Sequence, residues 1–306
     1  MDRLIKVFGE RNTATRAVIG MVDAAEGIQG VAHEGVSVEA IEPYNEMISR
    51  VEAAYRGPWK RVYREAIKDL RAEHLGPLGA WKHAAPAYDP AYRTEGVGVI
   101  FMVRNPYSWI SSLHRRPYHN MGKRMPTLVE FLDLPWMTVG RDNLDRILPS
   151  PAMLWPLKVR AYRAFEAAAR ADGLGCAWVR FEDFVQWPVP TLTRALQALG
   201  IPHEGLSALA RSTKPYGALP RERRSFYGRE LWRDALCRGS VSRVNTHIDW
   251  SLAEDFGYAR LTPQEFPDAP RLHGEGSPAA TAGGGIGVFD HKSRADDLRR
   301  VINGGV

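Results

Sequence analysis

Short apolar runs alternate with helical stretches along most of the 306-residue chain. The run 97–103 is apolar on both faces, as is typical of a central parallel strand. Further strands are predicted over 4–8 and 176–181, with a short one over 78–81. Apolar residues at helical spacing predict helices that begin near 17 and 106, and others over 38–75, 128–134, 155–171 and 191–199.

This alternation predicts an α/β fold of three layers, in which helices flank a mostly parallel central sheet. The opening strand, tight loop and helix are typical of a P-loop-like nucleotide-binding architecture. Residues 1–265 are interpreted as a single domain, in which 38–95 form a helical and loop insertion that Gly57-Pro58 divides. Residues 266–306 are rich in Gly, Ala, Pro and Ser, which predicts a flexible tail.

Charge and cysteine content narrow the class of ligand. The chain has 41 basic and 35 acidic residues, a net charge of +6, so an anionic ligand is favoured and nucleic acid stays open. Two cysteines without a CxxC pair exclude a disulfide framework and give no sign of a metal site. Without a secretory leader or a run of about 18 apolar residues, we expect a cytoplasmic protein with no membrane span.

The loop after the first predicted strand has the features of an anion site. It places small and hydroxyl residues before a helix, where backbone amides carry partial positive charge. Its candidate binding residues are Arg11, Asn12, Thr13, Ala14, Thr15 and Arg16. The nucleoside-triphosphate motif GxxxxGK followed by Ser or Thr is absent, so an ordinary polar turn is the alternative.

Two more polar clusters follow predicted strands. Arg104 ends the most apolar strand, and Ser112 lies about two turns along the next helix. An arginine and a hydroxyl on neighbouring elements suit a terminal phosphate. Lys82 and His83 supply a positive charge and a proton acceptor. Because ligands bind outside the carboxyl ends of strands in an open parallel sheet, one ligand that is anionic at two ends accounts for all three clusters.

In this order the motifs resemble those of sulfotransferases that use 3′-phosphoadenosine 5′-phosphosulfate (PAPS), bacterial members included. Residues 8–15 are similar to the 5′-phosphosulfate loop, and Val103–Pro106 with Ser112 to the 3′-phosphate motif. The segment 178–183 resembles a later strand of the family. Four residues resemble its closing helix: Asn245, Asp249, Gly257 and Tyr258.

The resemblance implies transfer of a sulfuryl group from PAPS to an acceptor hydroxyl, on a glycan or another hydroxylated substrate. Adenosine 3′,5′-bisphosphate (PAP) is the implied product. Residues 11–16 would hold the phosphosulfate, while Arg104 and Ser112 would bind the 3′-phosphate. The insertion 38–95 would shape the acceptor pocket, and 221–239 would supply a basic lid through Arg223 or Arg224.

The family's loop lysine has no counterpart here, because Asn12 stands in its place. The implied catalytic residues are therefore Arg11 and Lys82 for charge and His83 as the base. His114, His119 and Glu10 remain alternative bases.

Two other classes stay open: a P-loop phosphoryl-transfer enzyme, and a non-enzymatic basic protein that binds nucleic acid. The sequence leaves the acceptor and the oligomeric state undetermined.

Overall fold

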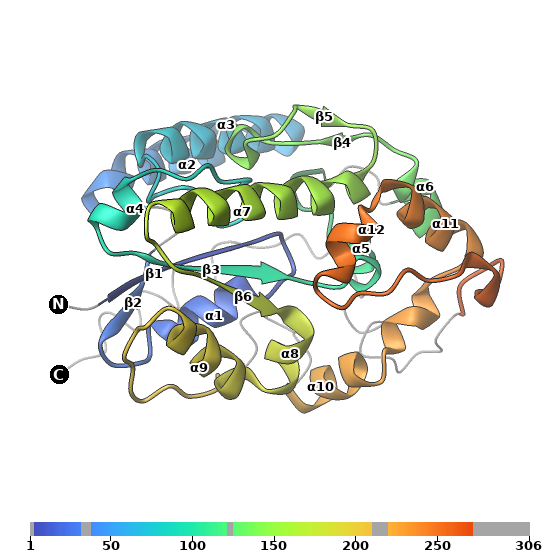
Figure 1. Cartoon of the computed structure of the whole chain (residues 1–306). Helices are drawn as coiled ribbons and strands as arrows, with labels where there is room; N and C mark the ends of the chain where they lie inside the picture. Colours follow the sequence, from blue (N-terminus) through green and yellow to red (C-terminus); the bar gives the residue numbers. More distant parts are fainter. Residues whose placement is uncertain (1–2, 32–37, 121–124, 210–219, 272–306) are drawn as a thin grey trace, which may run out of the picture. The chain divides into compact units, whose positions relative to one another are not determined.

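A four-stranded parallel sheet forms the centre of the fold (Figure 1). The computed structural model describes residues 3–31, 38–120, 125–209 and 220–271. The strands stand in the order β2-β1-β3-β6. Their bounds are β1 Arg3–Gly9, β2 Ile28–Gly30, β3 Gly98–Val103 and β6 Cys176–Arg180. β3 is buried along its whole length, as its two apolar faces predict.

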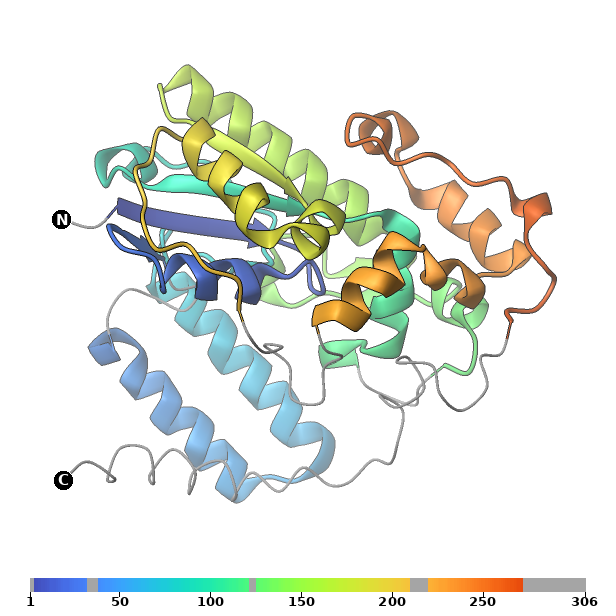
Figure 2. The ribbon, with the colours of Figure 1, turned by 90° about the horizontal axis from the view of Figure 1, so that it is seen from below.

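Helices cover both faces of this sheet. On one face, Ile5, Val7 and Met102 pack against α1 (Thr15–Val22), α8 (Phe181–Gln186) and α9 (Pro188–Ala198). On the other face, Phe8 and Phe101 pack against Tyr162 and Phe165 of α7 (Leu154–Ala171). The three-layer α/β fold with a parallel central sheet is therefore confirmed (Figures 1 and 2).

Two long helices lie side by side in the inserted segment (Figure 2). They are α2 (Val38–Ala54) and α3 (Gly57–His74). The predicted break between them is confirmed: Gly57 takes a positive φ of 65°, and Pro58 occupies the first turn, where its missing N–H is not needed. A short α4 (Ala91–Thr94) leads into β3.

Past the carboxyl ends of the strands, smaller elements enclose a second apolar core around Trp109 and Trp155. The helices there are α5 (Pro106–Arg115), α6 (Leu128–Leu132), α10 (Pro220–Gly228), α11 (Arg238–His247) and α12 (Trp250–Glu254). β4 (Trp136–Met137) and β5 (Ile147–Leu148) form an antiparallel pair. Five 3₁₀ turns complete the described elements: η1 Tyr118–Asn120, η2 Gly140–Asp142, η3 Pro151–Met153, η4 Leu231–Ala235 and η5 Pro263–Glu265.

The structure differs from the sequence-based expectation in three places. Residues 78–81 form a turn, so the short strand expected there is wrong. The edge strand β2 was not expected, because three residues that include Gly30 carry no strand periodicity. Past residue 265, Phe266 is buried and the amide of Arg271 donates to the carbonyl of Asp234, so packing on the domain continues to residue 271. The rest of the expected tail lies outside the described residues.

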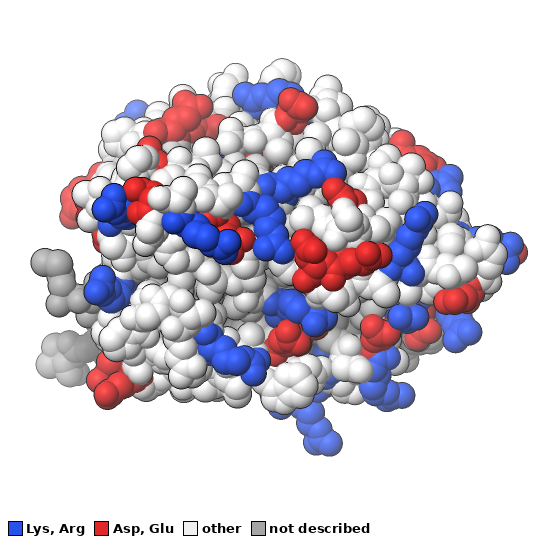
Figure 3. Space-filling model, viewed as in Figure 1, with Lys and Arg blue, Asp and Glu red and all other residues white. Residues whose placement is uncertain are grey.

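The surface offers no large single-sign region on the face shown in Figure 3, where Lys and Arg are interspersed with Asp and Glu. None of the helices in the described ranges is long and apolar enough to cross a membrane.

Gly9 is the position where β1 leaves no room for a side chain. A Cβ there would lie 2.6 Å from Cβ of Met102 and 2.6 Å from Oγ1 of Thr13. We expect Gly9→Ala to lower the free energy of unfolding by about 1–3 kcal/mol in urea denaturation, because the packed core cannot shift to admit a methyl group. Gly175→Ala is the control, since its Cβ would meet only Leu199, at 3.7 Å. Its expected effect is within about 0.5 kcal/mol, and equal losses in the two variants would contradict the steric account.

Candidate functional site

The loop between β1 and α1 presents unbonded amides at a helix N-terminus. Asn12 and Ala14 both take left-handed backbone conformations, with φ of 71° and 68°. Residues alternating in this way turn successive N–H groups toward one concavity, which suits an anion. No hydrogen bond between described residues uses the amides of Ala14, Thr15 or Arg16. The Thr13 hydroxyl instead donates to the carbonyl of Glu10 at 2.6 Å and braces the loop.

Arg104 joins this loop to the predicted phosphate motif. Its Nη1 donates to the carbonyl of Asn12 at 2.7 Å, and its Nη2 donates to Oγ of Ser112 at 2.9 Å. Further hydrogen bonds go to Oγ of Ser108 at 2.9 Å and to its carbonyl at 2.8 Å. The structure therefore brings the two predicted motifs into direct contact. This is expected because β1 and β3 are parallel neighbours, so their carboxyl ends meet at the same edge of the sheet.

Aromatic and basic side chains lie around Arg104 and Ser112. The ring of Phe181 lies 4.2 Å from Cζ, and the Tyr227 hydroxyl accepts from Nη2 at 3.1 Å. Arg115 donates to the same Ser112 hydroxyl at 3.1 Å. Burial first, and repulsion from Arg104 as well, lowers the pKa of Arg223 although Tyr227 opposes the shift. Three of these residues, Arg115, Phe181 and Tyr227, were not assigned to this motif from the sequence.

Of the two lid candidates, Arg223 is close enough to Arg104 for the two charges to repel each other. The carbonyl of Arg224 accepts from Nε2 of Gln186 at 2.7 Å, which ties α10 to α8.

Buried hydrogen bonds fix the turn that carries Arg104. The Glu182 carboxylate accepts from the Asn105 amide at 3.0 Å and from the Tyr258 hydroxyl at 2.8 Å. The indole of Trp155 donates to the carbonyl of Arg104 at 2.8 Å. The segments that resemble the family's later strand and closing helix therefore position the phosphate motif.

A buried cluster of four charges holds Arg11. Its Nη1 lies 2.9 Å from Oε1 of Glu10 and 3.4 Å from Oδ1 of Asp142. Lys158 of α7 pairs with both carboxylates, and its Nζ lies 2.6 Å from Asp142. Burial would lower the pKa of Arg11, but Asp142 and Glu10 raise it above its ordinary value. Sequence reasoning missed Lys158 and Asp142. A lysine spaced four residues from Leu154 and from Tyr162, on the buried face of α7, was the available signal.

Hydrogen bonds hold the turn that carries Lys82 and His83 against β1, although this turn is not a strand. The Gly9 amide donates to the carbonyl of Lys82 at 2.9 Å, past the point where β2 ends. Lys6 of β1 donates to the carbonyls of Leu78 and Ala80, each at 2.6 Å. Lys82 and His83 therefore reach the carboxyl end of the sheet as expected, although by a different local structure.

His83 is held as a neutral imidazole. Its Nδ1–H donates to the carbonyl of Gly9 at 2.5 Å, so Nε2 carries the free lone pair. Burial first, then Arg11 and Lys82, hold the pKa of His83 well below its ordinary value. The imidazole is therefore neutral at neutral pH, and its Nε2 lone pair is available to a donor group.

The alternative bases are less suitably placed. His119 donates from Nε2 to the carbonyl of Met137 at 2.7 Å, while its Nδ1 lies 3.4 Å from Arg11. His114 contacts the carbonyl of Met125 and does not line the cavity described next. The Glu10 carboxylate already forms ion pairs with Arg11 and Lys158, so it is less suited to act as the base.

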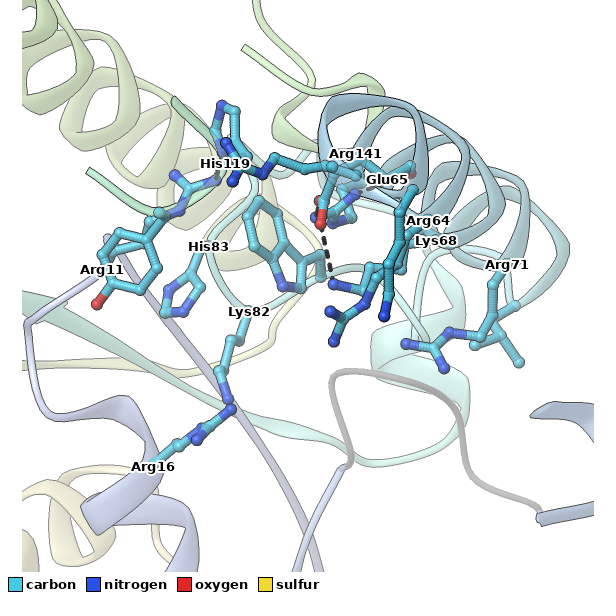
Figure 4. Close-up of a pocket in the computed structure, with 17 residues that line it drawn as sticks. Arg11, Arg16, Arg64, Glu65, Lys68, Arg71, Lys82, His83, His119 and Arg141 are labelled. Carbon is cyan, nitrogen blue, oxygen red and sulfur yellow. Dashed lines mark hydrogen bonds and ion pairs between the residues drawn. The ribbon is translucent and has the colours of Figure 1, made fainter. Parts of the chain in front are cut away.

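A cavity of about 490 Å³ opens beside these groups. Five of the residues named from the sequence line it: Arg11, Arg16, Lys82, His83 and the alternative base His119. Most of the other lining residues come from α3, which supports the expectation that the segment 38–95 shapes a pocket (Figure 4). Arg104 and Ser112 lie outside the lining, 2% and 9% exposed. The candidate site thus consists of the buried pair Arg104 and Ser112, predicted to bind phosphate, and an open cationic cavity, connected by the loop 10–14.

Comparison with known proteins finds similarity among solved structures. The sequence matches no family model and no curated protein. Among solved structures, the fold is similar to the sulfotransferase domain from the Curacin biosynthetic pathway, at 13% identity and a TM-score of 0.38. The match covers 85% of this chain and 99% of that one. The function proposed below rests on the residues of the site rather than on this similarity.

The pH dependence of the free energy of unfolding tests whether Lys6 is buried against the turn 78–83. Burial first, and then Lys82, lowers the pKa of Lys6 from 10.5 to about 7. Between these two values the unfolded chain binds more protons at Lys6 than the folded chain does, so Lys6 makes the free energy of unfolding rise with pH. We expect Lys6→Met to remove this rise, measured by urea denaturation from about pH 7 to about pH 10. Parallel curves for the variant and the wild type would show that Lys6 does not titrate in this range.

Proposed function

We propose that the protein is a sulfotransferase that moves a sulfuryl group from PAPS to an acceptor hydroxyl and releases PAP. The observation that supports this most is the contact of Arg104 with both the Asn12 carbonyl and the Ser112 hydroxyl. This contact places a guanidinium that can bind a phosphate next to a loop whose amides make no hydrogen bond with another described residue. PAPS is a nucleotide with two separate anionic groups, one for each of these places.

The 3′-phosphate of the donor would bind at Arg104 and Ser112. In the described structure the Tyr227 hydroxyl occupies the outer side of the guanidinium. A phosphate oxygen would replace that hydroxyl as the acceptor, and the short helix α10 that carries Tyr227 would adjust. Arg115 and Arg223 would add charge around the phosphate, which favours a doubly negative group over a neutral one.

The 5′-phosphosulfate would lie against the amides of Ala14, Thr15 and Arg16. Asn12, which replaces the family's lysine, does not reach toward it, because its Oδ1 accepts from the Tyr118 hydroxyl at 2.8 Å. The positive charge would come from Lys82 and Arg16 instead, with Arg11 behind them. Cations aimed at the oxygen that gains charge in the transition state lower the barrier.

His83 would remove the acceptor proton. As the acceptor oxygen bonds to sulfur, the bond from sulfur to the bridging oxygen breaks, and its electron pair stays on the 5′-phosphate. The acceptor proton moves to Nε2 of His83. The hydrogen bond from Nδ1 to Gly9 keeps the imidazole in the tautomer that this step needs.

Nucleotide binding tests the donor site. PAP and adenosine 5′-monophosphate differ only in the 3′-phosphate, so we expect wild type to bind PAP more tightly in calorimetry. Ser112→Ala should cost about three- to tenfold in PAP affinity and leave affinity for the monophosphate constant, while Arg104→Lys should cost about a hundredfold in PAP affinity and lower monophosphate affinity much less, because Arg104 also braces the 5′ loop. Ser111→Ala is the control, because that hydroxyl donates to the carbonyl of Tyr107.

Three results would contradict the proposal. They are equal binding of the two nucleotides, a stronger thermal stabilisation by ATP or NAD than by PAP, and an equal loss in the Ser111→Ala control.

Turnover tests the base. With PAPS and a hydroxylated acceptor, we expect His83→Gln to lower the rate by about two to four powers of ten, with PAP affinity unchanged, because the proton acceptor is lost. His114→Gln is the matched control and should keep the wild-type rate. A wild-type rate in His83→Gln would move the base to another residue.

A further inference from the structure

The hairpin of α2 and α3 exposes most of the large apolar side chains that reach the protein surface. Of the ten such side chains exposed in the described ranges, six belong to this hairpin. They are Met47, Tyr55, Trp59, Val62, Tyr63 and Leu70. Four of the six lie within residues 55–63, and Figure 2 shows the turn between the two helices at the end of the hairpin away from the central sheet. We refer to residues 53–63 as the hairpin tip.

On α3 the exposed apolar side chains and the cavity-lining side chains occupy opposite faces of the helix. Trp59, Val62 and Leu70 fall within about 80° of one another around the helix axis. Arg64 and Lys68, which line the cavity, lie about 140–180° from Trp59. Trp59 and Val62 are 65% and 58% exposed, although burial of such side chains is favourable. The apolar face is therefore a feature separate from the cavity.

Contacts within the hairpin hold the tip in one shape. The rings of Tyr55 and Tyr63 stack with their centroids 4.8 Å apart. Just behind the tip, Arg64 of α3 pairs with Glu52 of α2 at 3.4 Å, which joins the two helices. Because the rings are already ordered, a partner that binds them pays little conformational entropy.

The tip is basic, whereas the other end of α2 is acidic. The tip contains Arg56, Lys60 and Arg61 and neither Asp nor Glu. Of the four carboxylates of α2, three lie within residues 39–46, and the fourth is Glu52, which is already paired. The hairpin therefore has a gradient of charge along its length, and a negatively charged partner complements the tip rather than the start of α2.

We propose that the hairpin tip docks on the surface of an anionic lipid bilayer. The rings of Tyr55, Trp59 and Tyr63 would enter the interface between headgroups and acyl chains, where amphipathic aromatic side chains are favoured. Arg56 and Arg61 would face the lipid phosphates. Helices with aromatic and aliphatic side chains on one face and cations on the other bind bilayers in this way. The proposal goes beyond the proposed function and does not depend on it.

The composition of the tip favours a bilayer over the other partners that could cover it. A bilayer offers an apolar layer to the rings and a negative layer to the cations. A two-fold contact between two tips would instead place like charges against each other, because such an interface uses the same patch on both copies. A nucleic acid would match the charge and could stack on the rings, but it offers nothing to the exposed aliphatic side chains of Val62 and Leu70.

Vesicle flotation tests the docking with the full-length chain and without nucleotide. Vesicles of phosphatidylcholine alone are compared with vesicles that mix phosphatidylcholine and phosphatidylserine. We expect partitioning onto the mixed vesicles to exceed that onto the neutral ones by at least about tenfold, because each cation of the tip gains attraction near an anionic surface. The partitioning should weaken as the salt concentration rises.

Matched pairs of variants assign the effect to the tip. Trp59 is 65% exposed, and Trp187, between α8 and α9, is 59% exposed. We expect Trp59→Ser to lower partitioning onto the mixed vesicles by about tenfold or more, and Trp187→Ser to leave it unchanged. Arg56→Gln should lower it by about fivefold, whereas Arg194→Gln on α9 should not.

Quenching of tryptophan fluorescence by brominated lipids gives a second measurement that does not require binding to be lost. Wild-type fluorescence should be quenched on mixed vesicles that contain brominated phosphatidylcholine. The quenching should diminish in Trp59→Phe, which keeps an aromatic ring at the tip, and should persist in Trp187→Phe.

Several results would overturn the proposal: no binding to the mixed vesicles, an equal loss in the two Trp→Ser variants, or tighter binding of a single-stranded oligonucleotide than of the mixed vesicles. A concentration-dependent dimer that Trp59→Ser abolishes would also overturn it and would assign the tip to a second copy of the chain. Because no nucleotide is present, none of these results bears on whether PAP binds, so the proposed function stands or fails separately.

Discussion

The architecture of the site depends on the charge balance of one buried cluster. Arg11 and Lys158 face Glu10 and Asp142, and each of these side chains is at most 5% exposed. Removing one member would leave a buried charge without compensation, which typically costs about 3–5 kcal/mol. Because the four come from the loop after β1, from η2 and from α7, their pairing fixes the loop against the layer of helices above the sheet. Arg141, next to Asp142, pairs with Glu65 and Asp69 of α3, which extends the same constraint to that helix.

The cations of this protein therefore serve two different purposes. Arg11 and Lys158 are neutralised within the fold, and their main effect is to position other groups. Arg104 has a similar internal role, since its guanidinium bonds to the loop and to α5, but it also sits beside Arg115 and Arg223. The cations of α3 that line the cavity are less deeply buried, and two of them form ion pairs there, Arg64 with Glu52 and Lys68 with Glu65.

The proposed reaction uses the neighbouring positions of β1 and β3. Parallel strands deliver the amide loop and the Arg104 turn to the same edge, and one hydrogen bond from Arg104 to the Asn12 carbonyl joins them. On the far side of β1, the turn 78–83 brings His83 to the Gly9 carbonyl. In the proposed function, the nucleotide would lie along one side of this edge, with the acceptor in the cavity on the other side and the sulfuryl group between them.

Local signals in the sequence determined the strands β1, β3 and β6, the helices α5, α7 and α9, and the pairing of Arg104 with Ser112, because periodicity and residue spacing need no knowledge of distant contacts. They did not determine that residues 78–81 form a turn, which the hydrogen bonds of Lys6 and Gly9 stabilise across more than 70 positions. Lys158, Asp142 and the inward face of α3 were likewise decided by the tertiary structure. From the sequence alone, a charged residue is most simply interpreted as a solvated surface group. Only the fold shows which partners share its low-dielectric surroundings, because those partners come from segments far apart in the chain.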